Sequence, residues 1–562
     1  MKSKKILSLL ITFSLLATTA LFGCGGSDNK EGTSKGNIDK DQYLNVVLRQ
    51  EPKSLDPSKA SDLYSSQVIA EIYEGLTRIE QDENGKDVVK AAGAEKWDIS
   101  EDGLTWTFHL KDYNWSDGEK VKAKDFEYGI KRTLDPKVAS TYSYLLYPIK
   151  GAEAYNKNQG SADNVAVKAI DDKTLEIKLE KPCAYFLNLT YFKVMMPQRQ
   201  DIVEKYEGKF GTEPNYMLFC GPFNIKEWTH GNKIELVKND KYWDAKSVKL
   251  DKVTMKIVTD EQARMNELLN GSLDLALVTK TEWVDKFDKT GKFDTIKSFE
   301  PTTNYIFFNQ KEKVFSNAKV RKAFSVALDR EDIAKTVYRG LDAPAYAWCP
   351  PTLLIGNDEF RNKVNSEPAK KLKQENPDAK KLLIEGLKEL GMDEDPSKLS
   401  ITFSVGGTDA RDREVAEYYQ QVYKKVLGID LKIDYSQWAV FLENVQSLKY
   451  QMGMMAWSGD YNDPMTEFDL WITGSGMIPT GWSNPKYDEL INKAASLPKE
   501  KNDERAKLFA EAEKILIYDD ATVAPTTYRK KSMYKHKYVK GLMVPLFGSE
   551  MDLKYAYTEG RK

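Results

Sequence analysis

Segments with the pattern of strands alternate with segments with the pattern of helices along both halves of this sequence. In residues 104–110, apolar side chains alternate with polar ones, as in a strand with one buried face. In residues 411–427, apolar side chains recur with a helical period that ends at Gly428. This alternation predicts α/β domains with mixed sheets. Because 562 residues exceed what a single hydrophobic core supports, we expect two to four domains.

The same patterns predict the other elements of the chain. Further strands are expected at residues 43–49, 174–179, 234–237, 253–258, 305–309, 399–404, 429–433 and 450–457. Further helices are expected at residues 62–73, 122–134, 260–269, 320–338, 379–390 and 437–448. No segment repeats at a fixed period.

The first residues have the features of an export signal. Lys2, Lys4 and Lys5 precede an apolar run over residues 6–21, and the small residue Gly23 follows. A permanent transmembrane helix is the alternative, but the apolar run is short and is not followed by charged residues. We therefore predict a cleaved signal peptide over residues 1–23.

The end of this segment predicts a lipid anchor. Its order Leu21-Phe22-Gly23-Cys24 is similar to a bacterial lipobox, which implies that Cys24 is diacylated after cleavage. Residues 24–41, rich in Gly, Ser, Asn, Asp and Lys, are then expected to form a flexible linker. The protein is accordingly expected at the outer face of the bacterial cell membrane, anchored through Cys24.

Composition excludes several classes of function. Lys and Arg total 83 against 85 for Asp and Glu, and the charges are spread along the chain, so nucleic acid is not an expected partner. Besides Cys24, the odd set Cys183, Cys220 and Cys349 cannot form a complete disulfide framework, although one bridge stays open. The three histidines are far apart and no zinc spacing is present, so no metal is expected.

Motifs of catalysis are absent from the sequence. It contains no H-E-x-x-H and no P-loop, and neither a G-x-S-x-G elbow nor a G-x-G-x-x-G follows a predicted strand. With few histidines, an imidazole acid–base pair also has little to draw on. We therefore expect a binding protein without a cofactor rather than an enzyme.

One stretch, residues 454–464, has the features of a binding site. Asp460 follows the predicted strand 450–457, where Gly459 and the Asn462-Asp463-Pro464 run predict a turn. Folded scaffolds commonly present binding groups at such exits. Because aromatic residues stand at Trp457 and Tyr461, the Asp460 carboxylate suits a protonated amine with an apolar stem. The alternative is that Asp460 only caps the turn.

Several blocks of residues in fixed order carry a resemblance to a known family. These are Ala94-Glu95-Lys96-Trp97, residues 103–110, Trp115-Ser116-Asp117-Gly118, Ala123-Lys124-Asp125-Phe126, Gly221-Pro222-Phe223, residues 239–243, and residues 320–330. Through them the chain resembles the peptide and nickel class of extracytoplasmic solute-binding proteins, family 5, and within it the oligopeptide-binding lipoproteins of ABC importers. The likeness runs from about Tyr43 to the C-terminus.

The resemblance implies an α/β fold of the large, type II periplasmic-binding-protein kind. Two hinged lobes with mixed sheets would close on a ligand, and an extra domain would be inserted in the first lobe. Lobe I would comprise residues 42–63, 191–300 and 530–562, the extra domain residues 64–190, and lobe II residues 301–529.

The resemblance also implies a function and a site. The chain would act as a monomer that captures oligopeptides and delivers them to an ABC transporter permease. In the motif W-x-x-D-Y-N-x-P, matched here by Trp457, Asp460, Tyr461, Asn462 and Pro464, the acid pairs with the peptide α-amino group. The main chain of Ala456, Ser458 and Gly459 on one lobe, and of Glu51, Pro52 and Lys53 on the other, would hold the peptide as an added strand.

Departures from the family pattern leave the cargo open. Cations that neutralise the peptide C-terminus in relatives align with Val445, Met454 and Asp412. Arg411 and Arg413 could substitute, or could be surface charges. This favours peptides longer than tripeptides. Alternative cargoes are dipeptides, nickel chelates and oligosaccharides, and a signalling-peptide receptor is an alternative role.

Overall fold

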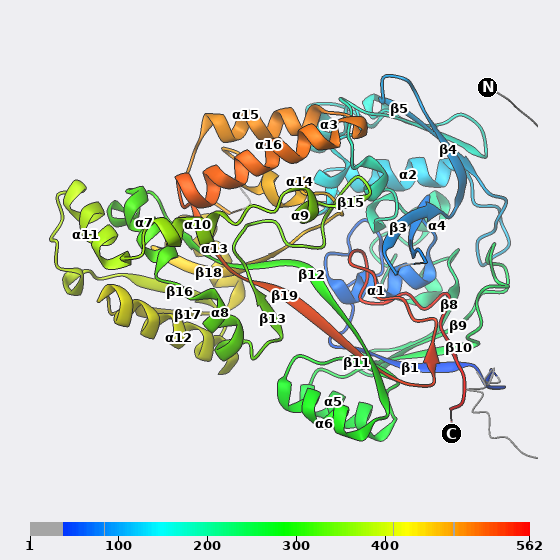
Figure 1. The fold of residues 1–562 in the computed structure, drawn as a ribbon. Coiled ribbons are helices and arrows are strands. Elements are labelled where there is room, and N and C mark those ends of the chain that lie inside the picture. The colour runs from blue at the N-terminus through cyan, green and yellow to red at the C-terminus, as the bar shows by residue number, and fades with distance from the viewer. Residues whose placement is uncertain (1–37, 84, 409, 476–477, 562) are drawn as a thin grey trace, which may run out of the picture. The chain divides into compact units, whose positions relative to one another are not determined.

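The largest sheet of the protein has seven strands (Figure 1). The computed structural model describes residues 38–561 except 84, 409 and 476–477. In order across the sheet, the strands are β11 (Leu275–Leu277), β19 (Val523–His536), β12 (Phe293–Phe308), β18 (Met452–Ser458), β16 (Thr402–Gly406) and β17 (Lys432–Ser436), with β13 (Asp342–Pro344) also beside β19. Because β16 runs parallel to β17 and β18 while the other pairs are antiparallel, the predicted mixed sheet is confirmed.

Two long strands, β12 and β19, run side by side in this sheet (Figure 1). β12 has 16 residues and begins well before the strand predicted at residues 305–309. Its N-terminal half alternates polar and apolar side chains less regularly, which hid that half from the sequence patterns. The pairing of β12 with β19 shifts register between Phe299 and Thr303, so both strands are locally irregular at that point.

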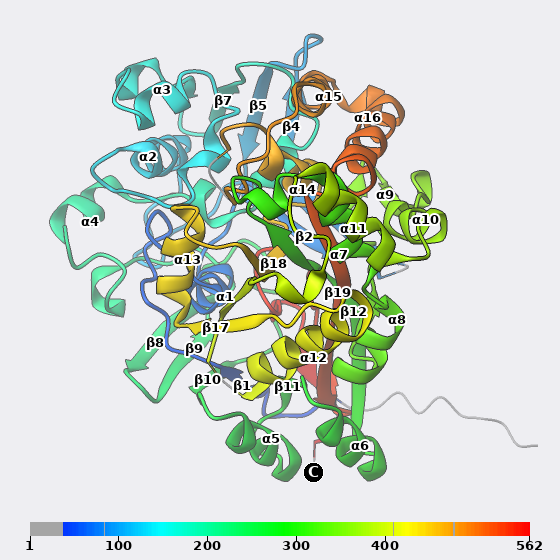
Figure 2. The ribbon, with the colours of Figure 1, turned by 90° about the vertical axis from the view of Figure 1, so that its left-hand side faces the viewer.

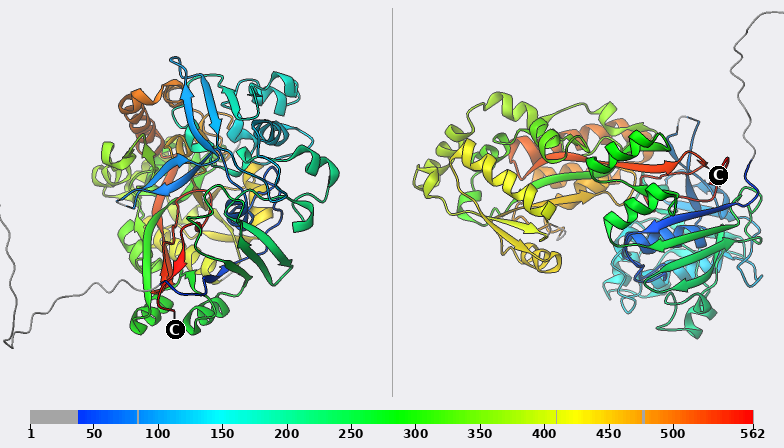
Figure 3. Two further views of the ribbon diagram at one scale, coloured as in Figure 1. Left: turned by 90° about the vertical axis from the view of Figure 1, so that its right-hand side faces the viewer. Right: turned by 90° about the horizontal axis from the view of Figure 1, so that it is seen from below.

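Two four-stranded sheets account for most other strands. The first joins β1 (Tyr43–Leu48), β10 (Lys252–Ile257), β9 (Lys233–Lys238) and β8 (Phe223–Thr229), and Figure 3 shows β1 in blue beside the other three. The second joins β4 (Ala94–Ile99), β5 (Thr105–Leu110), β7 (Thr174–Lys178) and β6 (Val167–Ala169). Two-stranded pairs are β2 (Thr77–Gln81) with β3 (Asp87–Ala91), β14 (Leu354–Ile355) with β15 (Asp358–Glu359), and β20 (Val539–Lys540) with β21 (Tyr557–Thr558).

The helices have clear start and stop signals. α1 begins where the Asp62 carboxylate accepts the Ser65 backbone N–H, and α5 ends at Gly271, whose φ of 83° suits glycine. The helices are α1 (Leu63–Ile72), α2 (Ala123–Leu134), α3 (Ala152–Asn156), α4 (Gln200–Lys205), α5 (Glu261–Asn270), α6 (Thr281–Thr290), α7 (Ala318–Val326), α8 (Arg330–Asp332), α9 (Phe360–Lys363), α10 (Pro368–Glu375), α11 (Ala379–Glu389), α12 (Ala410–Leu427), α13 (Trp438–Gln446), α14 (Met465–Phe468), α15 (Pro485–Ser496) and α16 (Asn502–Lys514). Figure 2 shows α12 beside β17.

The single helix predicted at residues 320–338 is wrong. α7 ends at Val326, and a new helix starts where the Asp329 carboxylate accepts the backbone N–H of Asp332. The Asp329 carboxylate thus takes the Asp332 N–H, which in a continuous helix would donate to a backbone carbonyl one turn earlier. A second helix therefore begins here. The restarted segment ends in a π-helical turn over Ile333–Val337.

Apolar packing holds the described part of the chain together. One cluster lies between the largest sheet and α7, α11 and α12, and includes Phe308, Phe324 and Tyr423. Another surrounds α5 and α6, and a third, larger one reaches from Leu44 in β1 to Ala556. Cys183, Cys220 and Cys349 are free, buried thiols, so the disulfide left open by the sequence does not form among them.

The predicted signal peptide and the lipidation of Cys24 lie outside the described residues, as does most of the linker over residues 24–41. Within residues 38–561, apart from the gaps stated above, no helix is both long and apolar enough to cross a bilayer.

Candidate functional site

Asp460 stands two residues beyond the end of β18. The strand predicted at residues 450–457 is confirmed, with observed bounds Met452–Ser458. The Gly459 N–H donates to the Pro301 carbonyl at 2.8 Å, and the Asp460 N–H donates to Thr466 Oγ1 at 2.8 Å. The Trp457 indole N–H donates to the Thr466 carbonyl at 3.1 Å. These bonds fix the backbone on both sides of the Asp460 side chain against α14.

The Asp460 carboxylate is half-buried and accepts a hydrogen bond from a distant tyrosine. Tyr144 Oη donates to Oδ2 of Asp460 at 2.5 Å. Burial raises the pKa of Asp460 above its ordinary value, and this rise is partly offset by the Tyr144 hydroxyl and by the charge of Lys193. A bound cation would therefore stabilise the ionised carboxylate.

Lys193 is a buried cation near this carboxylate. It begins the short 3₁₀ helix Lys193–Met195, and its Nζ donates to Ser66 Oγ at 2.7 Å and lies 4.4 Å from the centroid of the Tyr142 ring. Burial lowers the pKa of Lys193 to about 8, although the charges of Asp62 and Asp460 act against this. Burial and then the negative charge of Asp460 raise the pKa of Tyr142 to about 12. The Asp460 carboxylate thus lies near the aromatic side chains of Tyr142 and Tyr144 and near the Lys193 ammonium group, whose pKa is lowered.

A cavity of about 630 Å³ opens beside Asp460. That volume lies within the range of small-ligand sites. Its walls come from segments that are far apart in the sequence: Arg49, Asp62, Leu63, Ser66, Tyr142, Phe192, Lys193, residues 277–279, residues 300–302, Tyr338, Leu341, Asp342, Arg411, residues 458–460, residues 529–532 and residues 546–550. The structure thus brings Ser458, Gly459 and Asp460 together on one wall.

The edge of β18 beside this cavity is open on one side. β12 pairs with β18 along Met452–Ser458, whereas β16 pairs only with residues 452–454. Because Gly459 donates toward β12, the alternation of a strand turns the N–H and C=O groups of Ala456 and Ser458 away from β12. Because β16 pairs with β18 only up to residue 454, the main-chain groups of Ala456 and Ser458 on this side have no strand beside them among the described strands. An extended segment could pair with them.

The Tyr461 and Asn462 side chains lie outside the cavity beside Asp460. The Tyr461 ring is buried, stacks on Tyr185 at a centroid distance of 4.6 Å, and its hydroxyl donates to Asp469 at 3.2 Å. Asn462 Oδ1 accepts the Leu354 N–H at 2.8 Å. Neither residue lines the cavity beside Asp460, so each positions the turn instead.

Glu51, Pro52 and Lys53 lie away from the cavity. Its described lining residues include Arg49 but none of these three. The Glu51 carboxylate accepts the indole N–H of Trp228 at 3.0 Å, lies 2.6 Å from His230 Nδ1 and accepts the Gly231 N–H at 2.6 Å. The structure therefore does not bring these residues together with Asp460.

The positions that the resemblance predicted to align with C-terminal cations have mixed surroundings. Val445 is buried in the core and Met454 is half-buried in β18. Arg411 lines the cavity, where its guanidinium donates to the Val337 carbonyl at 2.9 Å and to Glu414 at 3.0 Å. The Arg413 guanidinium lies over the Tyr435 ring instead. Of the two candidate substitutes, only Arg411 faces the cavity.

Sequence reasoning missed Tyr144, Lys193 and Ser66. Tyr144 hydrogen-bonds to Asp460, Lys193 acts on Asp460 through its charge, and Ser66 hydrogen-bonds to Lys193. The three residues lie far from Asp460 in the sequence, so no local pattern linked them to it. The only signal was the cluster of aromatic residues around Tyr142 and Tyr144. Among the residues described, no cluster of three or more His, Cys, Asp or Glu side chains is placed to hold a metal ion.

Comparison with known proteins identifies several relatives. The family model for bacterial extracellular solute-binding proteins, family 5, middle region, matches residues 88–478. The oligopeptide-binding protein OppA of Bacillus subtilis is 35% identical over 98% of both chains. The substrate-binding domain of an oligopeptide ABC transporter from Bacillus anthracis has a TM-score of 0.76 at 30% identity, covering 93% of this chain and 99% of that one.

A further solved structure, Listeria monocytogenes OppA bound to peptide, has a TM-score of 0.74 at 30% identity and covers 92% of this chain and 99% of its own. Together these likenesses confirm the expected fold, the large type II periplasmic-binding-protein-like α/β fold.

Proposed function

Because the chain belongs to family 5 of the bacterial extracellular solute-binding proteins, we propose that it captures oligopeptides in the cavity beside Asp460 and delivers them to an ABC transporter permease. As a member of this family it is a binding protein and not an enzyme, as the sequence predicted. The relatives described above, named for oligopeptide binding or solved with peptide, support this cargo.

The observation that carries the proposal is the half-buried Asp460 carboxylate in the cavity wall. A peptide α-amine has a pKa near 8 and is largely protonated at neutral pH. On binding, the peptide ammonium would pair with the Asp460 carboxylate, next to the aromatic ring of Tyr142. This pairing would offset the cost of keeping the carboxylate charged while it is partly buried. Tyr144 already donates one hydrogen bond, which leaves other lone pairs of the carboxylate for the ligand.

The open edge of β18 supports main-chain recognition of the peptide body. An extended peptide that pairs with Ala456 and Ser458 would add a strand beside β18, where β16 no longer pairs. Backbone pairing is independent of side-chain identity, so it suits a protein with varied cargo. Glu51, Pro52 and Lys53 were also expected to pair with the peptide, and in this conformation they would need to approach the cavity to do so.

The lobe division is also a proposal. Lobe I would comprise residues 42–63, 191–300 and 530–562, lobe II residues 301–529, and the extra domain residues 64–190. It is supported by β12 and β19, each of which runs across a proposed boundary, at residues 300–301 and 529–530. The register shift between Phe299 and Thr303 falls at the first boundary, where less regular pairing would ease a hinge rotation.

The protein is extracytoplasmic, as the family description states. We propose in addition that it is a monomer anchored through diacylated Cys24 at the outer face of the bacterial cell membrane. The support is the lipobox-like order Leu21-Phe22-Gly23-Cys24 after an apolar run. Metabolic labelling with a radioactive fatty acid tests this: label should enter wild type and be absent from Cys24→Ser.

The peptide proposal is tested by Asp460→Asn. This substitution keeps the shape of the side chain and removes its charge, and a hydrogen bond to a charged group is worth roughly 1.5–3 kcal/mol. Calorimetry should therefore give roughly 10- to 150-fold weaker binding of a free-amine peptide, with little change for its N-acetylated form. Asp393→Asn, at an exposed carboxylate paired with Lys398, is the matched control. Equal affinity of wild type and Asp460→Asn for the free-amine peptide would refute the ion pair.

Peptides longer than tripeptides are the proposed preference. Of the positions aligned with C-terminal cations in relatives, Val445 is buried and Met454 is half-buried and uncharged. A calorimetric length series tests this, and tightest binding of tripeptides would contradict it. Mass spectrometry of copurifying ligands separates oligopeptides from the alternatives, namely dipeptides, nickel chelates, oligosaccharides and a signalling peptide.

A further inference from the structure

A second cavity, of about 890 Å³, lies apart from the cavity beside Asp460. It is bounded by the β2–β3 hairpin, by β4 and β5, and by residues 184–191, 354–357, 462–463 and 499–502. The two cavities have no lining residue in common. Asn462 and Asp463 line the second cavity, so it lies behind the turn that carries Asp460.

The floor of this second cavity is aromatic and apolar. In the β4–β5 pair, Trp106 is opposite Ile99, and Phe108 is opposite Trp97, so these side chains share one face of the sheet. α2 packs against the β6–β7 half of the same sheet. The side chains of Trp97, Ile99 and Trp106 therefore face the cavity, and Trp97 and Ile99 are only half-buried. A flat apolar molecule would find a matching surface there.

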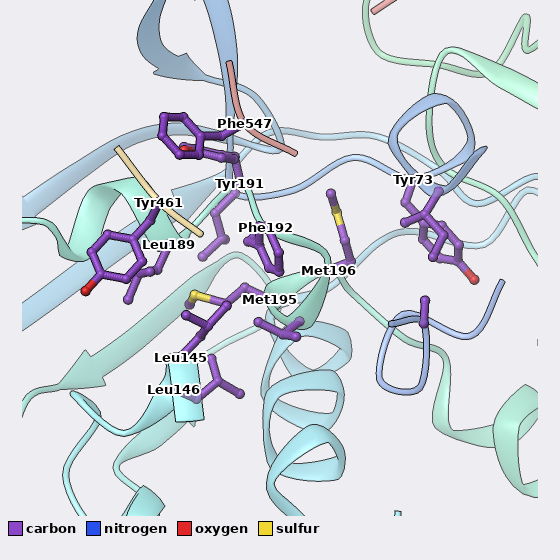
Figure 4. Packing of buried hydrophobic residues seen from close by; sticks show 14 of the residues in the cluster. Tyr73, Leu145, Leu146, Leu189, Tyr191, Phe192, Met195, Met196, Tyr461 and Phe547 are labelled. Carbon is purple, nitrogen blue, oxygen red and sulfur yellow. The ribbon is translucent and has the colours of Figure 1, made fainter. Parts of the chain in front are cut away.

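Two buried hydrogen-bond donors line the cavity without a partner in the described part of the chain. They are the indole N–H of Trp106, which is 7% exposed, and the hydroxyl of Tyr191, which is 8% exposed. Figure 4 shows Tyr191 above Phe192, and these two residues with Phe547 also line a smaller cavity of about 60 Å³. A buried donor without a partner is destabilising, so an acceptor supplied by a ligand would be favourable.

Three charged side chains that line the cavity, Lys86, Asp87 and Asp463, are engaged with the protein itself. Lys86 Nζ donates to the Asn357 carbonyl. Asp463 accepts two hydrogen bonds from the buried Arg505 guanidinium, at 2.7 and 2.9 Å, and Asp87 accepts the Leu546 N–H at 2.8 Å. Since burial raises the pKa of Tyr191, its hydroxyl stays protonated and acts as a donor at neutral pH. A neutral ligand fits these surroundings better than an ion.

We propose that this second cavity is an accessory binding site for a neutral aromatic molecule that carries a carbonyl or another hydrogen-bond acceptor. The aromatic ring lies against Trp97 and Trp106, and the acceptor takes a hydrogen bond from Trp106 Nε1 or Tyr191 Oη. Because the site has its own walls, it can be filled while a peptide occupies the cavity beside Asp460.

The probe for this site is N-acetyl-L-phenylalaninamide, which is neutral, aromatic, rich in acceptors and without an amine for Asp460. Saturation-transfer NMR with the full chain should detect binding to wild type and to Asp460→Asn, and saturating pentaalanine should not displace the probe. Tyr191→Phe and Trp106→Phe each remove one N–H or O–H donor and keep a ring, so roughly 2- to 12-fold weaker binding is expected.

Tyr113→Phe is the matched control, because Tyr113 also has a buried hydroxyl without a partner in the described chain but does not line this cavity. Its affinity for the probe should equal that of wild type. Absence of probe binding to wild type, displacement by pentaalanine, or unchanged affinity in Tyr191→Phe and Trp106→Phe would each overturn the proposal. These outcomes are independent of the Asp460→Asn test of peptide binding.

Discussion

The turn that carries Asp460 is held by a buried ion pair whose loss should be costly. Arg505 on α16 donates from Nη2 to Asp463 Oδ1 at 2.7 Å and from Nη1 to Oδ2 at 2.9 Å, and the two side chains are 1% and 4% exposed. The guanidinium also donates to Asn502 Oδ1 at 2.9 Å and to the Ala494 carbonyl at 3.2 Å. Arg505→Met removes all of these bonds and leaves the Asp463 carboxylate buried without its cation.

Removal of one partner of a buried ion pair costs roughly 3–5 kcal/mol, because the remaining charge is uncompensated. For domains of 150–250 residues, 1 kcal/mol corresponds to roughly 2–4 °C in Tm, so Arg505→Met should lower the Tm by roughly 6–20 °C. Scanning calorimetry measures this. Affinity for free-amine peptides should also fall, since Asp463 is three residues from Asp460 and accepts the Met465 N–H at 3.0 Å within the same turn.

A double-mutant cycle sharpens this prediction. Asp463→Asn alone leaves Arg505 without its anion, whereas Arg505→Met with Asp463→Asn leaves no buried charge, so the double variant should lose less stability than the sum of the single variants. Lys514→Met is the control, because Lys514 and Asp519 form an exposed ion pair at 2.7 Å, worth at most about 1 kcal/mol. A loss below about 1 kcal/mol for Arg505→Met, or strict additivity in the cycle, would refute the reasoning.

Three further predictions concern the same region. Burial raises the pKa of Asp469 to about 7, so this carboxyl contributes stability that is present below about pH 4 and is lost as the pH rises through 7. Between pH 4 and 8, the free energy of unfolding of Asp469→Asn should therefore rise by on the order of 4 kcal/mol relative to that of wild type. Parallel plots of unfolding free energy against pH for the two proteins would contradict this. Gly459→Ala would put its Cβ 2.8 Å from Thr466 Cγ2 and 3.1 Å from Glu467 Oε1, so denaturant titration should show a loss of roughly 1–3 kcal/mol, and an unchanged midpoint would count against this. If the exposed Arg411 guanidinium meets the peptide carboxylate, Arg411→Gln should weaken binding up to roughly fivefold by calorimetry, and a C-terminally amidated peptide should show no such loss.

The elements of the fold that depend on neighbouring residues could be predicted from the sequence. The alternation in β5 predicted the buried residues Trp106, Phe108 and Leu110, and the strand before Asp460 lies where its pattern indicated. The helix over residues 320–338 was wrong because its apolar period continues across Asp329, whose side chain starts a new helix. Asp329 is a common capping residue, but the helical period of the apolar residues was given more weight in the prediction.

The candidate site could be predicted only where it is continuous in the chain. Ser458, Gly459 and Asp460 follow one strand, and all three line the cavity. Tyr144 and Lys193 approach Asp460 from segments with no pattern in common with β18, and only tertiary packing brings them together. Glu51 was chosen through the family resemblance, and its carboxylate is engaged by Trp228, His230 and Gly231 instead.

The pairing of β12 with β19 also determines when the molecule can fold. The two strands are far apart in the chain, and β19 lies close to the C-terminus. During synthesis and export, the edge of β12 therefore stays unpaired until β19 has emerged, and contacts of such long sequence separation form slowly. A chain truncated before residue 523 would keep that edge permanently and would be prone to aggregate. β19, which is made long after β12, thus completes the largest sheet.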